Sequence, residues 1–271
     1  MGGVDAPIGV FDSGIGGLTV LAALMQALPH ERFMYLGDTA RLPYGTKSAQ
    51  TVARYAVQAA EALVRHGVKC LVVACNTAAS VGLDAVRARV GGGLPVVGVI
   101  EPGAQAACAA TTTGRIAVIA TEATVRGGAY ERAILARRPD ATVQQLPTQL
   151  LVALAEEGLV DGPVARSVVS HYLGALFAQQ PPDTLVLGCT HFPVLAAPIR
   201  EVVGPNISIV DSAQTTAAAV RAQLLAAGIA RTTGSPSLQF MATDGPERFA
   251  RVGSHFLGRT IDVRRIELID L

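Results

Sequence analysis

The sequence predicts an α/β protein with a mainly parallel sheet, and its internal similarity suggests that the unit is duplicated. Short apolar runs alternate with helical patterns along almost the whole chain, and strands joined by helices pair in parallel. Two of these runs stop at a cysteine in similar settings, residues 72–77 and 186–191. The 271 residues, 50% of them hydrophobic, suffice for one large core or two modest ones.

The expected strands are short runs of apolar and β-branched residues, a composition typical of strands buried on both faces. They comprise residues 7–11, 33–37, 69–74, 95–99, 116–120, 184–188 and 207–210. Between them, residues 18–28 follow a glycine-rich turn and residues 48–65 carry apolar side chains on one side, so we expect a helix over each. Residues 8–14 and 116–122 are again strands that run into polar turns, which extends the repeat beyond the cysteines.

Charge and chain ends exclude several classes of partner. The formal net charge of +1 gives no electrostatic footprint for nucleic acid or an anionic membrane. The first residues lack the basic region and apolar core of a secretory signal, and no later run approaches a membrane span. We therefore expect a cytoplasmic protein that acts on a small molecule, with no nucleic-acid or membrane partner.

The cysteines show neither a disulfide framework nor a metal site. Cys70, Cys75, Cys108 and Cys189 have no CxxC spacing and no histidine at zinc-ligand intervals. Free thiols fit a reducing compartment, and we expect no metal. Cys70 and Cys108 are interpreted as small, inert apolar side chains.

Cys75 and Cys189 are different because each ends a strand and precedes polar side chains suited to opening a helix. Open α/β sheets place their chemistry at the carboxyl ends of strands. A helix N-terminus would lower a thiol pKa from about 8.5 towards neutrality, so that thiol and thiolate are both populated. Asp12 near Cys75 and His191 near Cys189 are plausible proton partners.

Two further polar turns follow strands at the same edge. In residues 12–17, glycines let the backbone present N–H groups at the start of a helix, a nest that suits a substrate carboxylate. This segment lacks the register of GxGxxG and of a P-loop, so we do not favour phosphate binding. In the second turn, the Tyr44 side chain and the Gly45 backbone are candidates for ligand contact, although Pro43-Tyr44-Gly45 alone is more often only a turn.

Together these segments resemble the motif set of bacterial glutamate racemases, within the aspartate/glutamate racemase family. The motifs are Asp12-Ser13-Gly14, Pro43-Tyr44-Gly45, Cys75-Asn76-Thr77-Ala78 and Gly188-Cys189-Thr190-His191-Phe192-Pro193, in the family order and spanning nearly the whole chain. The resemblance implies a racemase that interconverts L- and D-glutamate without a cofactor and supplies D-glutamate to peptidoglycan. By position, Cys75 and Cys189 would exchange the α-proton. Asp12, Ser13, Tyr44, Gly45, Asn76, Thr77, Thr190 and His191 would hold the substrate.

The same resemblance implies two similar, doubly wound parallel-sheet domains with the active site in the cleft between them. Residues 1–98 plus 210–271 would form the first, discontinuous domain and residues 99–209 the second. Closure of the cleft would have to exclude water. A homodimer is expected on family grounds alone.

One departure from the family pattern concerns Thr148-Gln149, where many members show Cys-Pro. Asp38 and Glu156 match family acids, but an acid at the end of a surface helix is the commoner explanation, so neither is predicted as a site residue.

Three alternatives remain open. The first is a racemase of another amino acid, chiefly aspartate, although Thr190-His191 favours glutamate in the family comparison. The second is a Cys–His amidohydrolase or glutaminase, which would leave one cysteine without a role. The third is a non-catalytic solute-binding protein, which would not need paired thiols.

Overall fold

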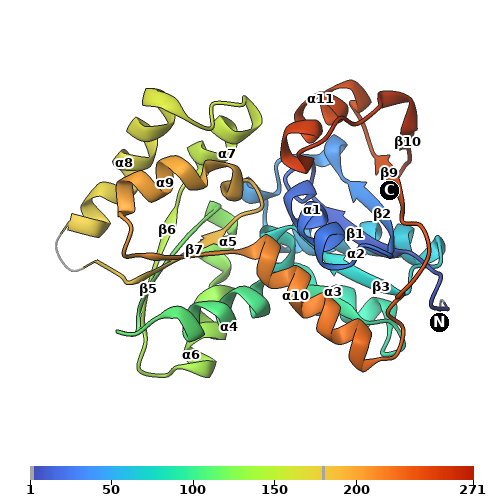
Figure 1. Cartoon of the computed structure of the whole chain (residues 1–271), viewed down its shortest axis with the longest axis horizontal. Coiled ribbons are helices and arrows are strands. Elements are labelled where there is room, and N and C mark those ends of the chain that lie inside the picture. The colour runs from blue at the N-terminus through green and yellow to red at the C-terminus, as the bar shows by residue number, and fades with distance from the viewer. Residues whose placement is uncertain (1–2, 179–180) are drawn as a thin grey trace.

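The computed structural model describes residues 3–178 and 181–271, which form two parallel sheets with helices on both faces (Figure 1). Every strand pair recorded in them is parallel. The first sheet has the order β10-β9-β2-β1-β3-β4 and the second β6-β5-β7-β8. The expected fold class is therefore confirmed.

The strands of the first sheet are β1 (Ile8–Asp12), β2 (Arg32–Gly37), β3 (Cys70–Val73), β4 (Val96–Gly98), β9 (Ser237–Ala242) and β10 (Ile266–Leu268). Those of the second are β5 (Arg115–Ala120), β6 (Thr142–Pro147), β7 (Thr184–Gly188) and β8 (Ser208–Asp211). Four consecutive strands have equivalent order in the two sheets, β2-β1-β3-β4 and β6-β5-β7-β8. This arrangement agrees with the repeat suggested by the sequence.

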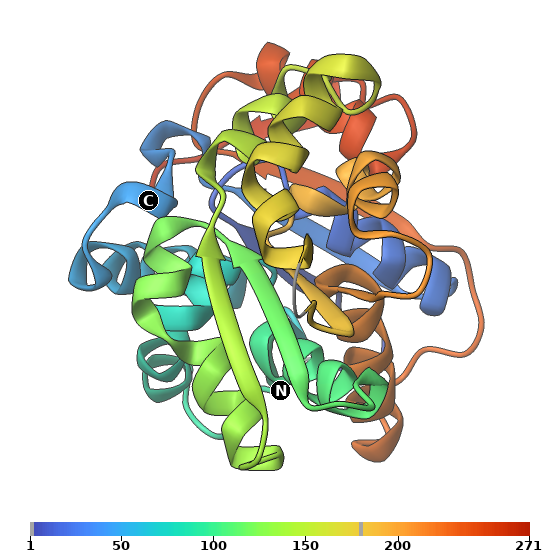
Figure 2. The same ribbon diagram turned by 90° about the vertical axis from the view of Figure 1, so that its left-hand side faces the viewer.

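Helices cover both faces of each sheet (Figures 1 and 2). Around the first sheet lie α1 (Leu18–Ala27), α2 (Ala49–Arg65), α3 (Asn76–Val90), α10 (Ser212–Ala226) and α11 (Pro246–Leu257). Around the second lie α4 (Ile100–Ala110), α5 (Glu122–Gly127), α6 (Ala129–Arg137), α7 (Gln149–Glu156), α8 (Gly162–Ala178) and α9 (Ala196–Val203). Short 3-10 helices are η1 (Thr39–Arg41), η2 (Tyr44–Thr46), η3 (Phe192–Leu195) and η4 (Val263–Arg265).

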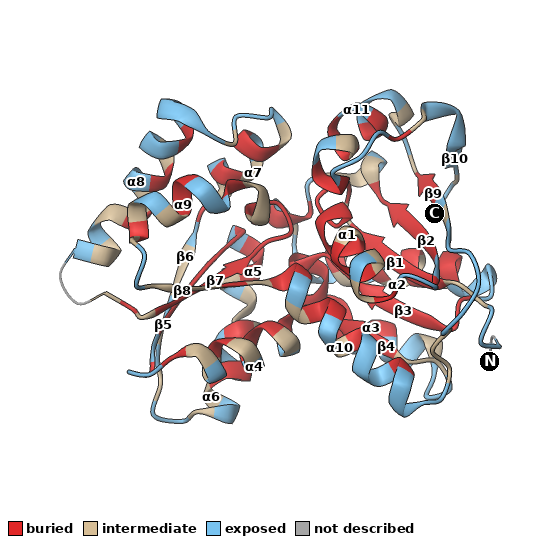
Figure 3. Cartoon of the chain, in the orientation of Figure 1, coloured by how far each residue is buried: buried red, intermediate tan, exposed pale blue. Residues whose placement is uncertain are grey.

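The central strands carry the core because helices shield both of their faces. β1, β3 and β7 are buried along their whole length, as the continuous apolar runs predicted (Figure 3). The chain leaves the first sheet after β4 and returns to it through α10. This helix packs against α1, beside the first sheet, and against α4, beside the second. The domain boundaries at residues 98/99 and 209/210 stay a prediction; β8, which spans the second of them, pairs with β7.

Among the described residues, none of the helices combines the length and apolar character needed to cross a membrane.

Candidate active site

The two cysteines singled out by the sequence line one small cavity between the sheets. Cys75 follows β3 in the first sheet, and Cys189 follows β7 in the second. The side chains and backbone around it are Ser13, Leu42, Pro43, Tyr44, Gly45, Cys75, Asn76, Thr77, Thr121, Gln149, Val152, Glu156, Cys189, Thr190 and His191. All the predicted site residues except Asp12 are therefore brought to one surface.

Cys75 is the N-cap residue of α3, as a strand that runs directly into a helix predicts. Its Sγ accepts a hydrogen bond from the backbone N–H of Ala78 at 3.4 Å and donates to Ser13 Oγ at 3.4 Å. Burial, reinforced by the negative charge of Asp12, nevertheless raises the pKa of the Cys75 thiol to about 12. The prediction that the helix start lowers this pKa is wrong, because loss of hydration outweighs the two hydrogen bonds.

Cys189 lies beside a histidine that is held from its other side. Its Sγ is 3.6 Å from His191 Nδ1, and His191 Nε2 is 3.1 Å from Glu156 Oε1. Burial alone would lower the pKa of His191, but the hydrogen bonds to Cys189 and Glu156 outweigh burial and raise it to about 10. The imidazole is therefore charged at neutral pH and can stabilise a thiolate at Cys189 or return a proton to it.

Glu156 belongs to this site, contrary to the sequence interpretation of a surface helix end. It lines the cavity and accepts from Arg248 Nη2 at 2.6 Å as well as contacting His191. Its pKa is lowered, first by the hydrogen bond with His191 and then by Arg248, although burial opposes this. The family resemblance was the signal for Glu156; its position in the chain alone was not.

Asp12 lies behind the cavity wall. Its Oδ2 accepts from the backbone N–H of Gly14 at 2.9 Å, and Oδ1 has no hydrogen-bond partner among the described residues. Burial raises the pKa of this carboxyl, partly offset by the charge of His191. The Cys75 thiol contacts Ser13 and not Asp12. Asp12 therefore influences Cys75 and His191 through the electrostatic effect of its negative charge.

The glycine turn after β1 does not form the open carboxylate nest predicted from the sequence. The other domain covers it: Thr19 Oγ1 donates to the carbonyl of Thr190 at 2.9 Å. A Cβ on Gly16 would lie 2.5 Å from Thr190 Oγ1, so only glycine permits this close approach. From this turn only Ser13 lines the cavity.

Neutral hydrogen-bonding groups fill much of the remaining wall. Asn76 Oδ1 accepts from Tyr130 at 2.8 Å, which fixes the orientation of its amide. The Thr77 hydroxyl is 2.9 Å from that of Thr121, the N-cap residue of α5 in the second domain. Thr121 was not predicted as a site residue, yet it follows β5 as Ser13 follows β1, so the repeat itself was the signal that could have found it.

The Tyr44 hydroxyl is already engaged, because it donates to the buried Asp38 carboxylate. Arg41 Nε also donates to Asp38, at 2.7 Å. Asp38 therefore has a structural role in shaping the turn. The ring of Tyr44 and the backbone of Gly45 remain as the surfaces that face the cavity.

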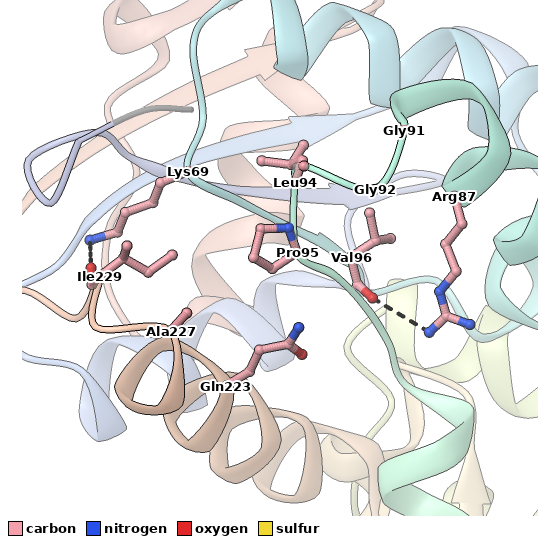
Figure 4. A pocket seen from close by; sticks show the side chains of 11 residues that line it. Lys69, Arg87, Gly91, Gly92, Leu94, Pro95, Val96, Gln223, Ala227 and Ile229 are labelled. Atoms are coloured by element: carbon pink, nitrogen blue, oxygen red, sulfur yellow. Dashed lines mark hydrogen bonds between the residues drawn. The ribbon is translucent and has the colours of Figure 1, made fainter.

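A larger cavity, of about 580 Å³, lies elsewhere, between residues 91–96 and α10 (Figure 4). It has no thiol, and the Lys69 amine beside it is turned to the carbonyl of Ile229 at 2.8 Å and to Glu31 at 2.6 Å. Within the described part of the chain, no group of three or more His, Cys, Asp or Glu side chains is arranged to hold a metal ion. The paired-cysteine cavity, by contrast, brings two thiols, a histidine and a carboxylate together.

Comparisons with known proteins agree with this geometry. A family model described as Asp/Glu/Hydantoin racemase matches residues 13–220. The chain is 47% identical over 264 residues to a glutamate racemase of Geobacter metallireducens, covering 96% of each chain. It is 46% identical over 270 residues to one of Neisseria meningitidis serogroup A, covering 99% of this chain and 98% of the relative.

Among solved structures, the glutamate racemase of Francisella tularensis in complex with D-glutamate superposes with a TM-score of 0.91. Its sequence is 35% identical, and the match covers 98% of each chain. A glutamate racemase of Thermus thermophilus in complex with β-chloro-D-alanine gives a TM-score of 0.89 at 41% identity, covering 99% of this chain and 98% of that one.

Proposed function

The chain belongs to the Asp/Glu/hydantoin racemase family, and on that premise we propose that it is a glutamate racemase that uses two cysteines and no cofactor. The observation that carries the proposal is that Cys75 and Cys189, one from each domain, line a single cavity. Two acid–base groups on different walls suit inversion at one carbon, whereas a Cys–His hydrolase has no use for the second thiol.

In the proposed reaction, one thiolate removes the α-proton of glutamate and the opposing thiol delivers its own proton to the other face. No atom is gained or lost, and the two cysteines exchange protonation states. By family position, Cys75 takes the proton of D-glutamate and Cys189 that of L-glutamate. The α-proton is far less acidic than a thiol, so the developing carbanion must be stabilised by preorganised hydrogen bonds in a site that excludes water.

The chain's own side chains would supply that stabilisation. Ser13, Asn76, Thr77 and Thr190 would orient the ammonium and carboxylate groups, with Tyr44 and Gly45 shaping the wall. His191, held as a cation by Glu156, would promote proton exchange at Cys189. Asp12, which does not line the cavity, would influence Cys75 and His191 through its negative charge. The role in peptidoglycan supply, the cytoplasmic location and a homodimer stay predictions.

Circular dichroism of D-glutamate and, separately, L-glutamate with purified enzyme and no added cofactor tests the proposal. We expect the optical signal to decay to zero from both sides, and Cys75→Ser and Cys189→Ser each to abolish the decay. In D₂O the product should carry deuterium at the α-carbon. With glutamine as a second substrate, ammonia release without α-deuteration would indicate an amidohydrolase instead. Decay of the optical signal with aspartate but not with glutamate would indicate an aspartate racemase.

The kinetics carry an internal control. The two enantiomers have equal free energy, so the values of kcat/KM for D- and L-glutamate must be equal in the wild type and in every active variant. A variant that lowers kcat/KM for one enantiomer must therefore lower it by the same factor for the other.

A further inference from the structure

Arg248 extends the contacts of the active site into the other domain. From Cys189, the contacts run through His191 and Glu156 to Arg248 at 3.6, 3.1 and 2.6 Å. The first three residues belong to the loop after β7 and to α7, which surround the second sheet, whereas Arg248 lies on α11 beside the first (Figure 1). The ion pair between Glu156 and Arg248 therefore connects α7 of the second domain to α11 of the first.

Both charges of this pair occupy the helix end that disfavours them. Glu156 is the last residue of α7, where the helix dipole is negative, and Arg248 is in the first turn of α11, where it is positive. The helix dipoles alone would favour a basic residue at the end of α7 and an acidic residue at the start of α11. Their placement is explained by what they contact across the cleft, since violations of local preference concentrate at functional sites.

The charges of these contacts also balance one another. None of the residues that line the cavity is a lysine or arginine, and His191 is the group there that carries positive charge. Glu156 alone would neutralise His191. With Arg248 included, His191, Glu156 and Arg248 sum to one positive charge, which can balance the thiolate that the proposed reaction requires at one cysteine.

We propose that Arg248 is a positioning residue for racemisation: it holds Glu156, and through it His191, against Cys189 and latches α7 to α11 across the closed cleft. The substrate part of this proposal rests on the proposed function; the latch does not. Arg248 is 43% exposed, so its contribution is reduced by solvent.

The test compares Arg248→Gln with Arg251→Gln, an exposed arginine on the same helix for which the structure records no ion pair or hydrogen bond among the described residues. We expect Arg248→Gln to lower kcat/KM equally for both enantiomers by about three- to tenfold. Arg251→Gln should match wild type, and Arg248→Lys should recover most of the loss because it keeps the charge.

Two readouts separate positioning from general damage. Glu156 faces His191 and Arg248, and the charge of Asp12 also acts on it. Removal of the Arg248 charge should raise the Glu156 pKa. The acid limb of the pH–rate profile should therefore move to higher pH. In a Glu156→Gln background, Arg248→Gln should have little further effect.

Amide hydrogen exchange of α7, measured without substrate, tests the latch independently of the reaction. It should become faster in Arg248→Gln and stay unchanged in Arg251→Gln. The proposal would be overturned if Arg248→Gln changed neither the kinetics nor the exchange. It would also be overturned if the variant lowered the rate without shifting the acid limb, or if Arg248→Gln lowered the rate by the same factor in the Glu156→Gln background. Failure of wild type to racemise glutamate would instead refute the substrate, and exchange would still decide the latch.

Discussion

The Cys75 thiol shows how two local effects of opposite sign are resolved at a single residue. The start of α3 and the Ser13 hydroxyl favour the thiolate, whereas burial and Asp12 disfavour it. Burial prevails because only 5% of the residue is exposed and no basic side chain is among the causes that shift its pKa. Burial thus keeps Cys75 as a neutral thiol, which suits a proton donor. A nearby substrate ammonium would favour its conversion to the base.

This account predicts how Cys75 reacts with an alkylating reagent in the absence of substrate. With a pKa of about 12, the thiolate fraction, and hence the rate, should rise about tenfold per pH unit from pH 7 to 10. Mass spectrometry of the Cys75 peptide measures the rate. The same chain unfolded in urea is the control, and its rate should level off above about pH 8.5–9. A similar plateau in the folded protein would contradict the raised pKa.

At the scale of elements, Asp183 fixes the start of β7 to the loop that precedes β5. Its carboxylate accepts from the backbone N–H groups of Thr112 and Thr113 at 2.8 and 2.7 Å and from the Thr111 hydroxyl at 2.5 Å. Burial opposes ionisation, but these hydrogen bonds outweigh it and hold the pKa of Asp183 well below its usual range. The two central strands of the second sheet are thereby aligned at their amino ends.

Asp183→Asn should consequently destabilise the protein at pH 7, by about 1–2 kcal/mol after allowance for solvent exposure. A depressed folded-state pKa contributes stability above the unfolded value, near 3.9, and that contribution is lost as pH falls towards the folded value. The difference in Tm between wild type and variant should therefore shrink between pH 5 and about pH 2. Thermal melts measure it, with the exposed Asp161→Asn as control; a difference independent of pH would refute the account.

The sequence predicted the fully buried strands and missed strands that are partly exposed. The apolar runs located β1, β3 and β7 to within a residue or two, because these strands are shielded on both faces. It missed β6 and β10, which are sheet edges with exposed or half-buried residues, and β9, whose first half is largely exposed. Such strands need no continuous apolar run.

The same reasoning explains what was missed in the site. Residues directly after buried strands, such as Cys75 and Cys189, could be predicted because parallel strands end at one edge. Glu156 and Gln149 lie at the two ends of α7 and reach the cavity only through the packing of that helix. Arg248 depends on the relation of two domains, which no local pattern encodes.

For the whole molecule, the cavity that the two cysteines line is narrow as the structure stands. The volume open to the centres of water molecules is about 40 Å³, room for only a few of them. Glutamate has ten non-hydrogen atoms, so we expect the domains to separate for its entry and to close again for reaction, because the reaction needs water to be excluded. The two segments that join the sheets, after β4 and after β8, are the places where the backbone can accommodate that motion.

Such motion requires that each domain hold together on its own, although the first is made from both ends of the chain. Lys69 directly precedes β3, and Glu31 directly precedes β2. Lys69 Nζ lies 2.6 Å from Glu31 Oε2, and both side chains are fully buried. Lys69 also donates to the Ile229 carbonyl at 2.8 Å, and Glu31 accepts from the backbone N–H of Arg231 at 2.7 Å. This buried ion pair therefore ties the returning segment after α10 to the strands formed by the first part of the chain.

Lys69→Met should destabilise the protein by about 3–5 kcal/mol, because it leaves the Glu31 carboxylate buried without its counter-charge. The double variant Glu31→Gln/Lys69→Met should recover much of this loss, since the amide keeps its contact with Arg231 and no charge remains. Arg166→Met, which breaks the exposed ion pair to Glu201, should cost no more than about 1 kcal/mol. Urea unfolding followed by circular dichroism compares the three. If Lys69→Met were as mild as Arg166→Met, the first domain would not depend on this pair for its closure, and apolar packing of α10 against α1 would have to carry it.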